Sequence, residues 1–348
     1  MIKRICGVLL VFVVLECASA LNVRAQSNPA CYGVVYCSWS SLWGEACGAP
    51  ATGAYNCQGI PYEFSMACQV QNNACPPYAA PIENNCPHCN TAGSPISLAT
   101  GNTYIEQTDV RVPGLSNGLV LLRTWISQWP STQTASQVGL FGPNWRSTFE
   151  ERVFIGADHY IKYARSDGSF WSFGMSGVGI WGVAAPANVA VTLVAQSGTQ
   201  NWTMTFQNGE QRIFSQTSGS LIAIIDRNGN TTQLSYDAVN RLITVTDPAS
   251  RHLYFTYPSD TSRLVTSVTS DVGLSLSYAY DNQGRLTTVT KPDQTTIAFE
   301  YNGSSLITAV KDSNGKILES HTYDSNGRGL TSSRANGVEA VTVSYSNQ

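Results

Sequence analysis

Six tyrosines recur at a nearly constant interval in the last third of the chain, and this repeat limits the possible folds more than any other feature. Their separations are 21, 23, 21, 22 and 22 residues. A unit of about 22 residues suits a β-hairpin, which is unstable alone, so successive hairpins must pair or stack. We expect each ring to pack against the next unit while its hydroxyl reaches a polar partner. The tyrosines are Tyr236, Tyr257, Tyr280, Tyr301, Tyr323 and Tyr345.

Every second tyrosine is followed by an aspartate, and an arginine comes four residues after that aspartate. A period of about 44 residues therefore encloses the shorter one. We interpret the aspartates as turn or ladder hydrogen-bonding groups, because they recur with the repeat instead of forming an acid/base pair. The recurring positions besides the tyrosines are Asp237, Arg241, Asp281, Gly284, Arg285, Asp324, Gly327 and Arg328.

The composition favours strands and turns. Of 348 residues only 12 % are charged, 43 % are hydrophobic, and the formal net charge is −3 without a block of like charges. Such a balance argues against a nucleic-acid binder and against disorder. Between residues 103 and 215, apolar–polar alternation predicts a series of strands separated by turns, among them a Gly-rich stretch near residues 174–182 and a type I′ turn at Asn208-Gly209. Helices should be few and short.

The first 20 residues have the order of a secretory signal peptide. Lys3 and Arg4 precede an apolar run over residues 5–15, and Ala18-Ser19-Ala20 provides a cleavage motif, with Ala25 as a second site. After removal of this segment no stretch is long and apolar enough for a membrane helix, so we predict an exported protein.

Eight cysteines lie in one segment that is rich in Pro, Gly and Asn. An even number in an exported segment predicts up to four disulfides that staple a module without a large core, with the pairing left open. A redox or metal site at the closely spaced Cys86 and Cys89 is the alternative. The disulfide candidates are Cys31, Cys37, Cys47, Cys57, Cys68, Cys75, Cys86 and Cys89.

The three Tyr-Asp segments, with the stretches Ser94–Asn102, Arg123-Thr124-Trp125 and Leu140–Trp145, resemble the Rhs (rearrangement hotspot) and teneurin YD-repeat proteins. This resemblance covers residues 94–348 and implies β-hairpins that spiral into a shell, either enclosing a polypeptide toxin or serving surface recognition. With three Tyr-Asp pairs, we expect an open, partial shell. The predicted organisation is a signal peptide (1–20), a cysteine-rich module (21–92), a β-rich Rhs N-terminal domain (93–218) and YD repeats (219–348).

Few residues suggest catalysis. Residues 114–118 match G-x-S-x-G, but a predicted strand follows where a nucleophile elbow needs a helix. The four histidines are scattered, with His252 and His321 each two residues before a tyrosine, so we predict no catalytic, cofactor or metal site.

We expect a secreted or cell-surface bacterial scaffold without enzymatic activity. Its partner is a polypeptide cargo or the missing remainder of a shell. The second hypothesis is glycan binding through exposed aromatic rings; the candidate rings are Trp125, Trp129, Trp171 and Trp181.

Overall fold

The computed structural model describes residues 91–129, 138–156, 160–177, 179–186, 189–196 and 198–345. Nearly all regular structure in these ranges is β-strand, which confirms the mostly-β prediction. The helical elements there are two short 3₁₀ turns, η4 (Leu115–Asn117) and η5 (Ala335–Gly337). The predicted signal peptide and all eight cysteines of the predicted disulfide module lie outside the described residues.

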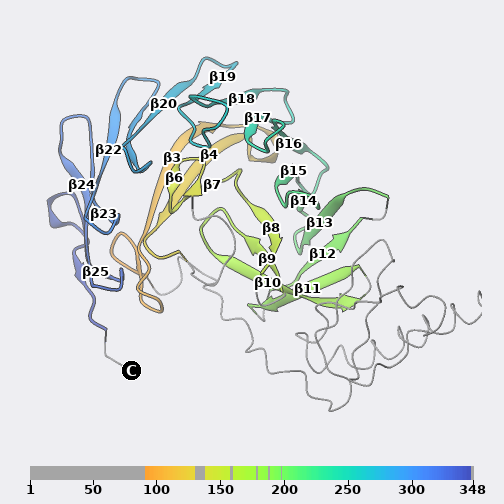
Figure 1. The fold of residues 1–348 in the computed structure, drawn as a ribbon, viewed down its shortest axis with the longest axis horizontal. Coiled ribbons are helices and arrows are strands. Elements are labelled where there is room, and N and C mark those ends of the chain that lie inside the picture. The colour runs from red at the N-terminus through yellow and green to blue at the C-terminus, as the bar shows by residue number, and fades with distance from the viewer. Residues whose placement is uncertain are drawn as a thin grey trace, which may run out of the picture.

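One long antiparallel sheet of 19 strands forms most of the structure, and each strand pairs with the next along the chain (Figure 1). Its strands are β8 (Arg152–Ile155), β9 (Ile161–Ala164), β10 (Phe170–Gly177), β11 (Ile180–Ala185), β12 (Val191–Ala195), β13 (Asn201–Phe206), β14 (Gln211–Ser215), β15 (Leu221–Ile225), β16 (Thr231–Tyr236), β17 (Leu242–Thr246), β18 (His252–Thr256), β19 (Ser267–Ser270), β20 (Ser275–Tyr280), β21 (Leu286–Thr290), β22 (Thr296–Tyr301), β23 (Ile307–Lys311), β24 (Ile317–Tyr323), β25 (Gly329–Arg334) and β26 (Val341–Thr342).

The sheet first coils on itself and then continues as an open arc. Arg152 in β8 forms a bridge with Ser220, and the N–H of Val153 donates to the carbonyl of Gly219, so β8 meets the start of β15. In the described residues no ladder joins the last strand β26 to β8, and the array as a whole is open. This confirms the predicted open, partial spiral. The sheet runs without interruption through residue 219, where the sequence predicts a domain boundary that stays a prediction.

A β-bulge recurs at most junctions between the hairpins of the repeats, whereas the β18–β19 ladder is regular. In β17, for example, Leu242 pairs with Tyr236 and Thr244 pairs with Ser235, so Ile243 is an extra residue. The same shift occurs before Tyr280, Tyr301 and Tyr323. Because a bulge bends its strand and increases the local twist, its repetition curves the sheet.

A smaller sheet lies within this curve (Figure 1). It consists of β3 (Tyr104–Val112), β4 (Leu119–Ile126) and β7 (Trp145–Ser147), with β4 in the middle. One hydrophobic core extends from Ile105 and Trp125 of this sheet to Phe299 and Val310 of the repeats. Two short hairpins accompany it: β1 (Thr91–Ala92) with β2 (Ile96–Ser97), and β5 (Val138–Gly139) with β6 (Gly142–Pro143).

Two local expectations are wrong. The Gly-rich stretch near residues 174–182 is not a separator, because Gly174 pairs with Gly182 inside the β10–β11 ladder. Packing of Trp181 against Trp202, with ring centroids 4.7 Å apart, holds β11 in the sheet despite its glycine. The turn at Asn208-Gly209 is not type I′, because among its residues the positive φ is at Gly209 alone.

Candidate functional site: the tyrosine hairpins and the N-terminal sheet they enclose

Each of the six predicted tyrosines closes the open end of one hairpin. The strands alternate between buried and exposed residues, and the rings of Tyr236, Tyr257, Tyr280, Tyr301 and Tyr323 pack against the hydrophobic core. The hydroxyls of all six donate to the carbonyl oxygen of a residue at the start of the partner strand or up to two residues before it. The pairs are Tyr236–Leu221 (2.6 Å), Tyr257–Leu242 (2.8 Å), Tyr280–Val265 (2.7 Å), Tyr301–Leu286 (2.8 Å), Tyr323–Ile307 (2.7 Å) and Tyr345–Gly329 (2.6 Å).

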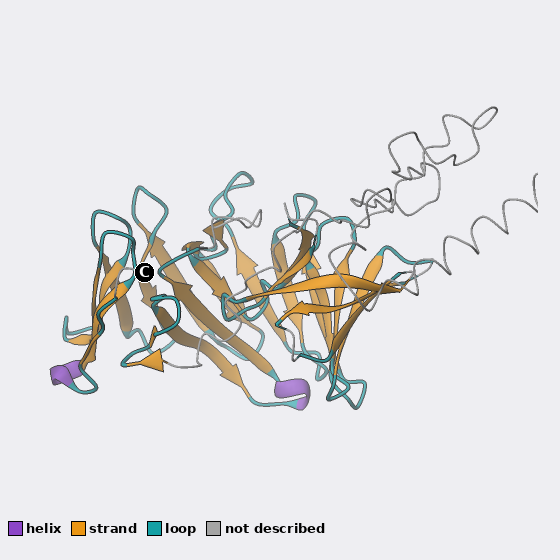
Figure 2. Cartoon of the chain, turned by 90° about the horizontal axis from the view of Figure 1, so that it is seen from below, coloured by secondary structure: helices purple, strands orange, loops and turns teal. Residues whose placement is uncertain are grey.

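Turns join the strands at both ends of the curved sheet (Figure 2). The aspartate of each Tyr-Asp pair organises the turn that follows its strand. Asp281 Oδ1 accepts hydrogen bonds from the backbone N–H groups of Gln283 (2.9 Å) and Arg285 (3.0 Å), and Gly284 adopts φ +74°. This geometry is a type I turn followed by a left-handed residue. Desolvation raises the pKa of Asp281, but the hydrogen bonds from Arg285 outweigh it and the pKa is lowered. Asp237 and Asp324 are bound in the same way.

The arginine of each Tyr-Asp unit connects its own turn to the next hairpin. Arg241 Nε donates to Asp237 Oδ2 at 2.6 Å. Its Nη1 donates to the carbonyls of Ser259 and Ser262 in the loop after β18, at the same end of the strands. Its guanidinium also lies 4.6 Å from the centre of the Tyr257 ring. Arg285 lies over Tyr301 and Arg328 over Tyr345 in the same manner, at 4.8 and 4.2 Å. The period of about 44 residues thus has a physical basis, because one arginine links two successive hairpins of about 22 residues each.

A buried ion pair joins the enclosed sheet to the repeats. Arg123 of β4 donates from Nε and Nη2 to Asp109 of β3, at 2.5 and 2.8 Å, and the Tyr278 hydroxyl donates to the same carboxylate at 2.8 Å. The guanidinium lies 4.6 Å from the Trp145 ring centre and 5.9 Å from that of Phe299. Burial lowers the pKa of Arg123, but the charge and hydrogen bonds of Asp109 outweigh it, so the pKa is raised.

The start of the described chain also contacts the last hairpins. The N–H of Gly329 donates to the carbonyl of Gly101 (2.8 Å), and Gln128 Nε2 donates to the carbonyl of Asn326 (3.0 Å). Ser332 Oγ both accepts from the N–H of Ser94 and donates to its carbonyl. A Cβ at Gly329 would lie 2.5 Å from Thr103 Oγ1, so this close approach requires glycine.

A second buried cluster lies where the sheet coils on itself. Glu151 accepts hydrogen bonds from the Tyr163 hydroxyl (2.7 Å) and from Arg212 Nε (3.1 Å), which come from β9 and β14. The sequence interpretation missed this cluster and the Arg123–Asp109 pair. One feature of the sequence indicates that Arg123 is buried. It occupies every second position of a strand together with Leu119, Leu121 and Trp125, which all face the core.

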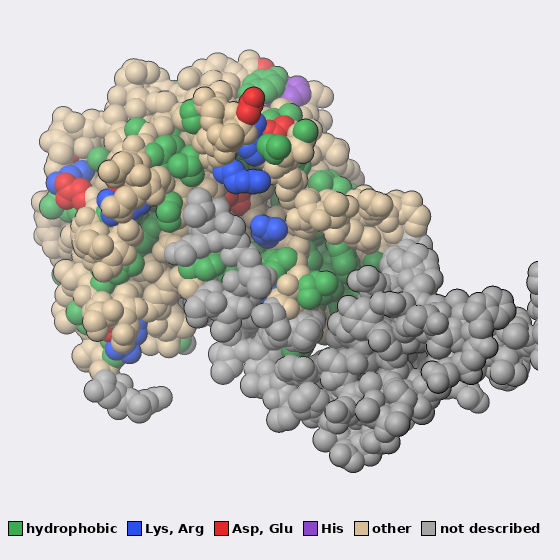
Figure 3. All heavy atoms as spheres, viewed as in Figure 1, with side chains coloured by type: hydrophobic (Ala, Val, Ile, Leu, Met, Phe, Trp, Pro, Cys, Tyr) green, Lys and Arg blue, Asp and Glu red, His purple; other side chains and the backbone are tan. Residues whose placement is uncertain are grey.

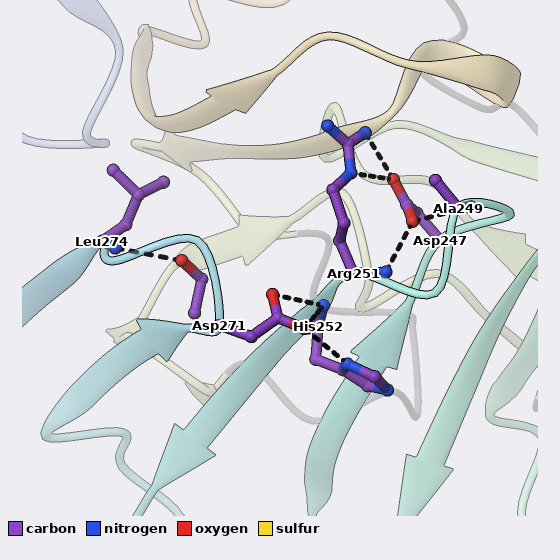
Figure 4. A network of polar contacts seen from close by, with 7 residues as sticks. Asp247, Ala249, Arg251, His252, Asp271 and Leu274 are labelled. Carbon is purple, nitrogen blue, oxygen red and sulfur yellow. Dashed lines mark hydrogen bonds and ion pairs between the residues drawn. The ribbon is translucent and has the colours of Figure 1, made fainter.

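The other candidate residues do not converge on a reaction centre in the described part of the chain. Ser116 lies in η4 and β4 follows it, so the geometry of a nucleophile elbow is missing at this position. His321 is buried, with Nε2 3.6 Å from the Glu319 carboxylate, whereas His252 is partly exposed and contacts Asp271 (Figure 4). In the same ranges no three His, Cys, Asp or Glu side chains come together as metal ligands, and no helix is long and apolar enough to cross a membrane.

The tryptophans proposed for glycan stacking face the core. Trp125 is fully buried and Trp171 nearly so, while Trp129 and Trp181 are partly buried by neighbouring aromatic rings. Trp125 and Trp171 therefore do not provide the exposed faces that stacking on a sugar needs, while a glycan contact at Trp129 or Trp181 stays a prediction.

Two family models match the chain. Residues 93–173 match a domain of unknown function, DUF6531, and residues 200–337 match the teneurin YD-shell. A search of curated proteins found no match.

Solved structures that match part of the chain include Tc toxin components. TcdB2-TccC3-TEV is 13 % identical with a TM-score of 0.27, covering 50 % of this chain and 12 % of that one. A Photorhabdus luminescens Tc holotoxin pore is 10 % identical with a TM-score of 0.24, covering 67 % and 14 %. A porin-like protein from Bacteroides uniformis is 12 % identical with a TM-score of 0.24, covering 61 % and 95 %.

The matched part of this chain thus spans between 10 % and 14 % of the toxin chains. The teneurin YD-shell model and the Tyr-Asp hairpins, with their arginine links, agree with each other over the repeats. Residues 200–337 are thus similar to the teneurin YD-shell, in agreement with the resemblance to Rhs/YD-repeat proteins.

Proposed function

We propose that this chain is an exported, non-enzymatic scaffold whose curved sheet holds its own N-terminal strands and presents its outer face and turns to partners. The observation that supports this role is the continuous core between β3, β4 and β7 and the concave face of the repeats, including the buried Arg123–Asp109–Tyr278 contact. Side chains of the same chain fill this part of the concave face. A scaffold for surface recognition fits this arrangement better than a container for a separate polypeptide.

The charge distribution agrees with such a scaffold. On the face seen in Figure 3, Lys, Arg, Asp and Glu lie in small mixed groups among uncharged side chains. Several charged side chains of the described residues form ion pairs, as in Arg241–Asp237 and Arg251–Asp247. A surface of this kind lacks the single-sign field that steers nucleic acid, so the partners we propose are proteins or glycans.

Hydrogen exchange on the full chain, purified from the medium of a secreting bacterial host, tests this proposal. We expect the amides of β3 and β4 to exchange as slowly as those of β20 and β22, because both belong to one core. Retention of the chain inside the cells would contradict export. Fast exchange in β3 and β4, together with a polypeptide that co-purifies in a fixed ratio, would instead support the housing of cargo.

A further inference from the structure

Tyr254 departs from the pattern of the repeat sheet. In β18 the residues Leu253 and Phe255 are buried, whereas Tyr254 points to the opposite, convex face, and 41 % of its surface is exposed. On β16 and β20, two strands away on either side, the convex positions include the polar residues Gln233, Ser235 and Ser277. An exposed ring at such a position gains no core packing, so its place calls for another explanation.

A histidine and an aspartate fix the orientation of this ring. His252, two residues earlier on the same face, stacks on Tyr254 with centroids 5.5 Å apart and an interplanar angle of 12°. Asp271, from the turn after β19, binds His252 Nδ1 at 2.8 Å and the His252 backbone N–H at 3.0 Å (Figure 4). The imidazole lies against one face of the ring, which leaves the opposite face and the hydroxyl edge for contact with solvent.

Free hydroxyl groups surround the ring. Thr244 and Thr269 are the register partners of Tyr254 on β17 and β19, so their side chains lie beside it on the same face. Among the described residues, the hydroxyls of Tyr254, Thr244 and Thr269 have no hydrogen-bond partner. The six tyrosines at the hairpin ends and Tyr278 all use theirs.

The charges next to this patch are already engaged. Arg251 is held by Asp247 in a salt bridge, with a further hydrogen bond from Nε at 2.8 Å (Figure 4). Asp271 is used by His252. The patch therefore offers one flat aromatic face, several neutral hydroxyls and an anchored imidazole–carboxylate pair, without a free cation for an anionic ligand.

We propose that Tyr254, with His252, Asp271, Thr244 and Thr269, binds a pyranose ring of a neutral oligosaccharide. The apolar face of the sugar stacks on the phenol ring, and its hydroxyls bind the threonines and the imidazole–carboxylate pair. One aromatic residue is too little for the buried core of a protein interface. With this site, neutral oligosaccharides are the ligand class of the proposed recognition scaffold. The sugar site rests on the proposed function only for its biological role.

Saturation-transfer NMR with the full secreted chain tests the site. The probes are cellohexaose, mannohexaose and chitohexaose, which differ in ring configuration and N-acetylation. We expect weak binding, about millimolar, of at least one probe, because the face is convex. Tyr254→Ala should weaken this binding by about tenfold or more, whereas Tyr254→Phe keeps the ring and should stay within about threefold.

Ile317→Ala is the matched control, because Ile317 is an exposed apolar residue on the distant strand β24. This variant should bind the probe as the unchanged chain does. Absence of binding for all three probes, or unchanged binding by Tyr254→Ala, would overturn the site. If that happens while β3 and β4 stay protected from hydrogen exchange, the scaffold proposal stands and the sugar site alone fails.

Discussion

The guanidinium of Arg285 lies 4.8 Å from the centre of the Tyr301 ring, one hairpin further along the chain, while its Nε donates to Asp281 at 2.6 Å. A single side chain thus couples a turn to the next hairpin. In repeat arrays, the free energy of unfolding is approximately the sum of the intrinsic stability of each repeat and the stability of each interface between adjacent repeats. This arginine contributes to an interface.

Replacement of this arginine should weaken that coupling. Arg285→Lys keeps the charge but loses the planar group that stacks on Tyr301, and we expect the free energy of unfolding to fall by about 1 kcal/mol. Urea unfolding of the full chain measures this change. Lys316→Ala, at an exposed turn position, is the control and should change stability by less than about 0.5 kcal/mol. Equal stability of Arg285→Lys and the unchanged chain would refute the coupling.

The tyrosine hydroxyls should contribute separately from the rings. Tyr301→Phe removes the hydrogen bond to the Leu286 carbonyl and leaves this oxygen without its donor, so we expect a loss of about 1 kcal/mol. Tyr254→Phe removes a hydroxyl that has no partner among the described residues, and its effect should be near zero. Thermal unfolding of both variants side by side gives the comparison, and similar losses in the two would argue against the hairpin closure.

Glycine at position 329 should be required for the contact between the N-terminal strands and the last hairpins. Gly329→Ala places a Cβ 2.5 Å from Thr103 Oγ1 and 3.0 Å from the Ile96 side chain, so we expect a loss of about 1–3 kcal/mol. Gly303→Ala is a suitable control, because no atom lies within 4 Å of its added Cβ and its φ is not positive. Hydrogen exchange should locate the effect of Gly329→Ala in residues 94–103, and a uniform effect over the chain would contradict this assignment.

Loss of one partner of the buried ion pair should be far more costly than loss of both. Asp109→Leu leaves Arg123 buried without its carboxylate, and we expect a loss of about 3–5 kcal/mol. In Asp109→Leu/Arg123→Met no charge remains unpaired, so much of this stability should return. A double-mutant cycle by urea unfolding measures the coupling. Additive losses would show that the two groups do not act as a pair.

Alkaline pH should destabilise the array of tyrosine hairpins. Burial raises the pKa of Tyr236, Tyr257 and Tyr280, and it raises that of Tyr301 to about 12. Because the folded state binds these protons more tightly, the stability they contribute is present below the unfolded pKa of about 10 and is lost as the pH rises above it. Urea midpoints between pH 8 and 11.5 measure the loss. A midpoint that is constant across this range would contradict the burial of these phenols.

Local and periodic features of the fold could be predicted from the sequence, while contacts between distant segments could not. The tyrosine interval predicts the hairpins, and the Asp-x-x-x-Arg spacing coincides with the turns that the structure shows. Arg123 and Tyr278 are 155 residues apart, and nothing local to either residue indicates that they share Asp109. Glycine is a poor guide to strand boundaries where tertiary packing outweighs local preference, as at Gly182 in β11.

The recurring bulge makes the radius of the arc a local property of the repeat. Most junctions between hairpins add one extra residue, at positions such as Ile243 and Thr287, while the β18–β19 junction adds none. Removal of one complete 44-residue unit should therefore shorten the arc and leave its radius unchanged, while deletion of Thr287 alone should flatten it at one joint. Gain or loss of whole units during evolution would then change the length of the curved sheet around the enclosed strands, while its curvature would stay the same.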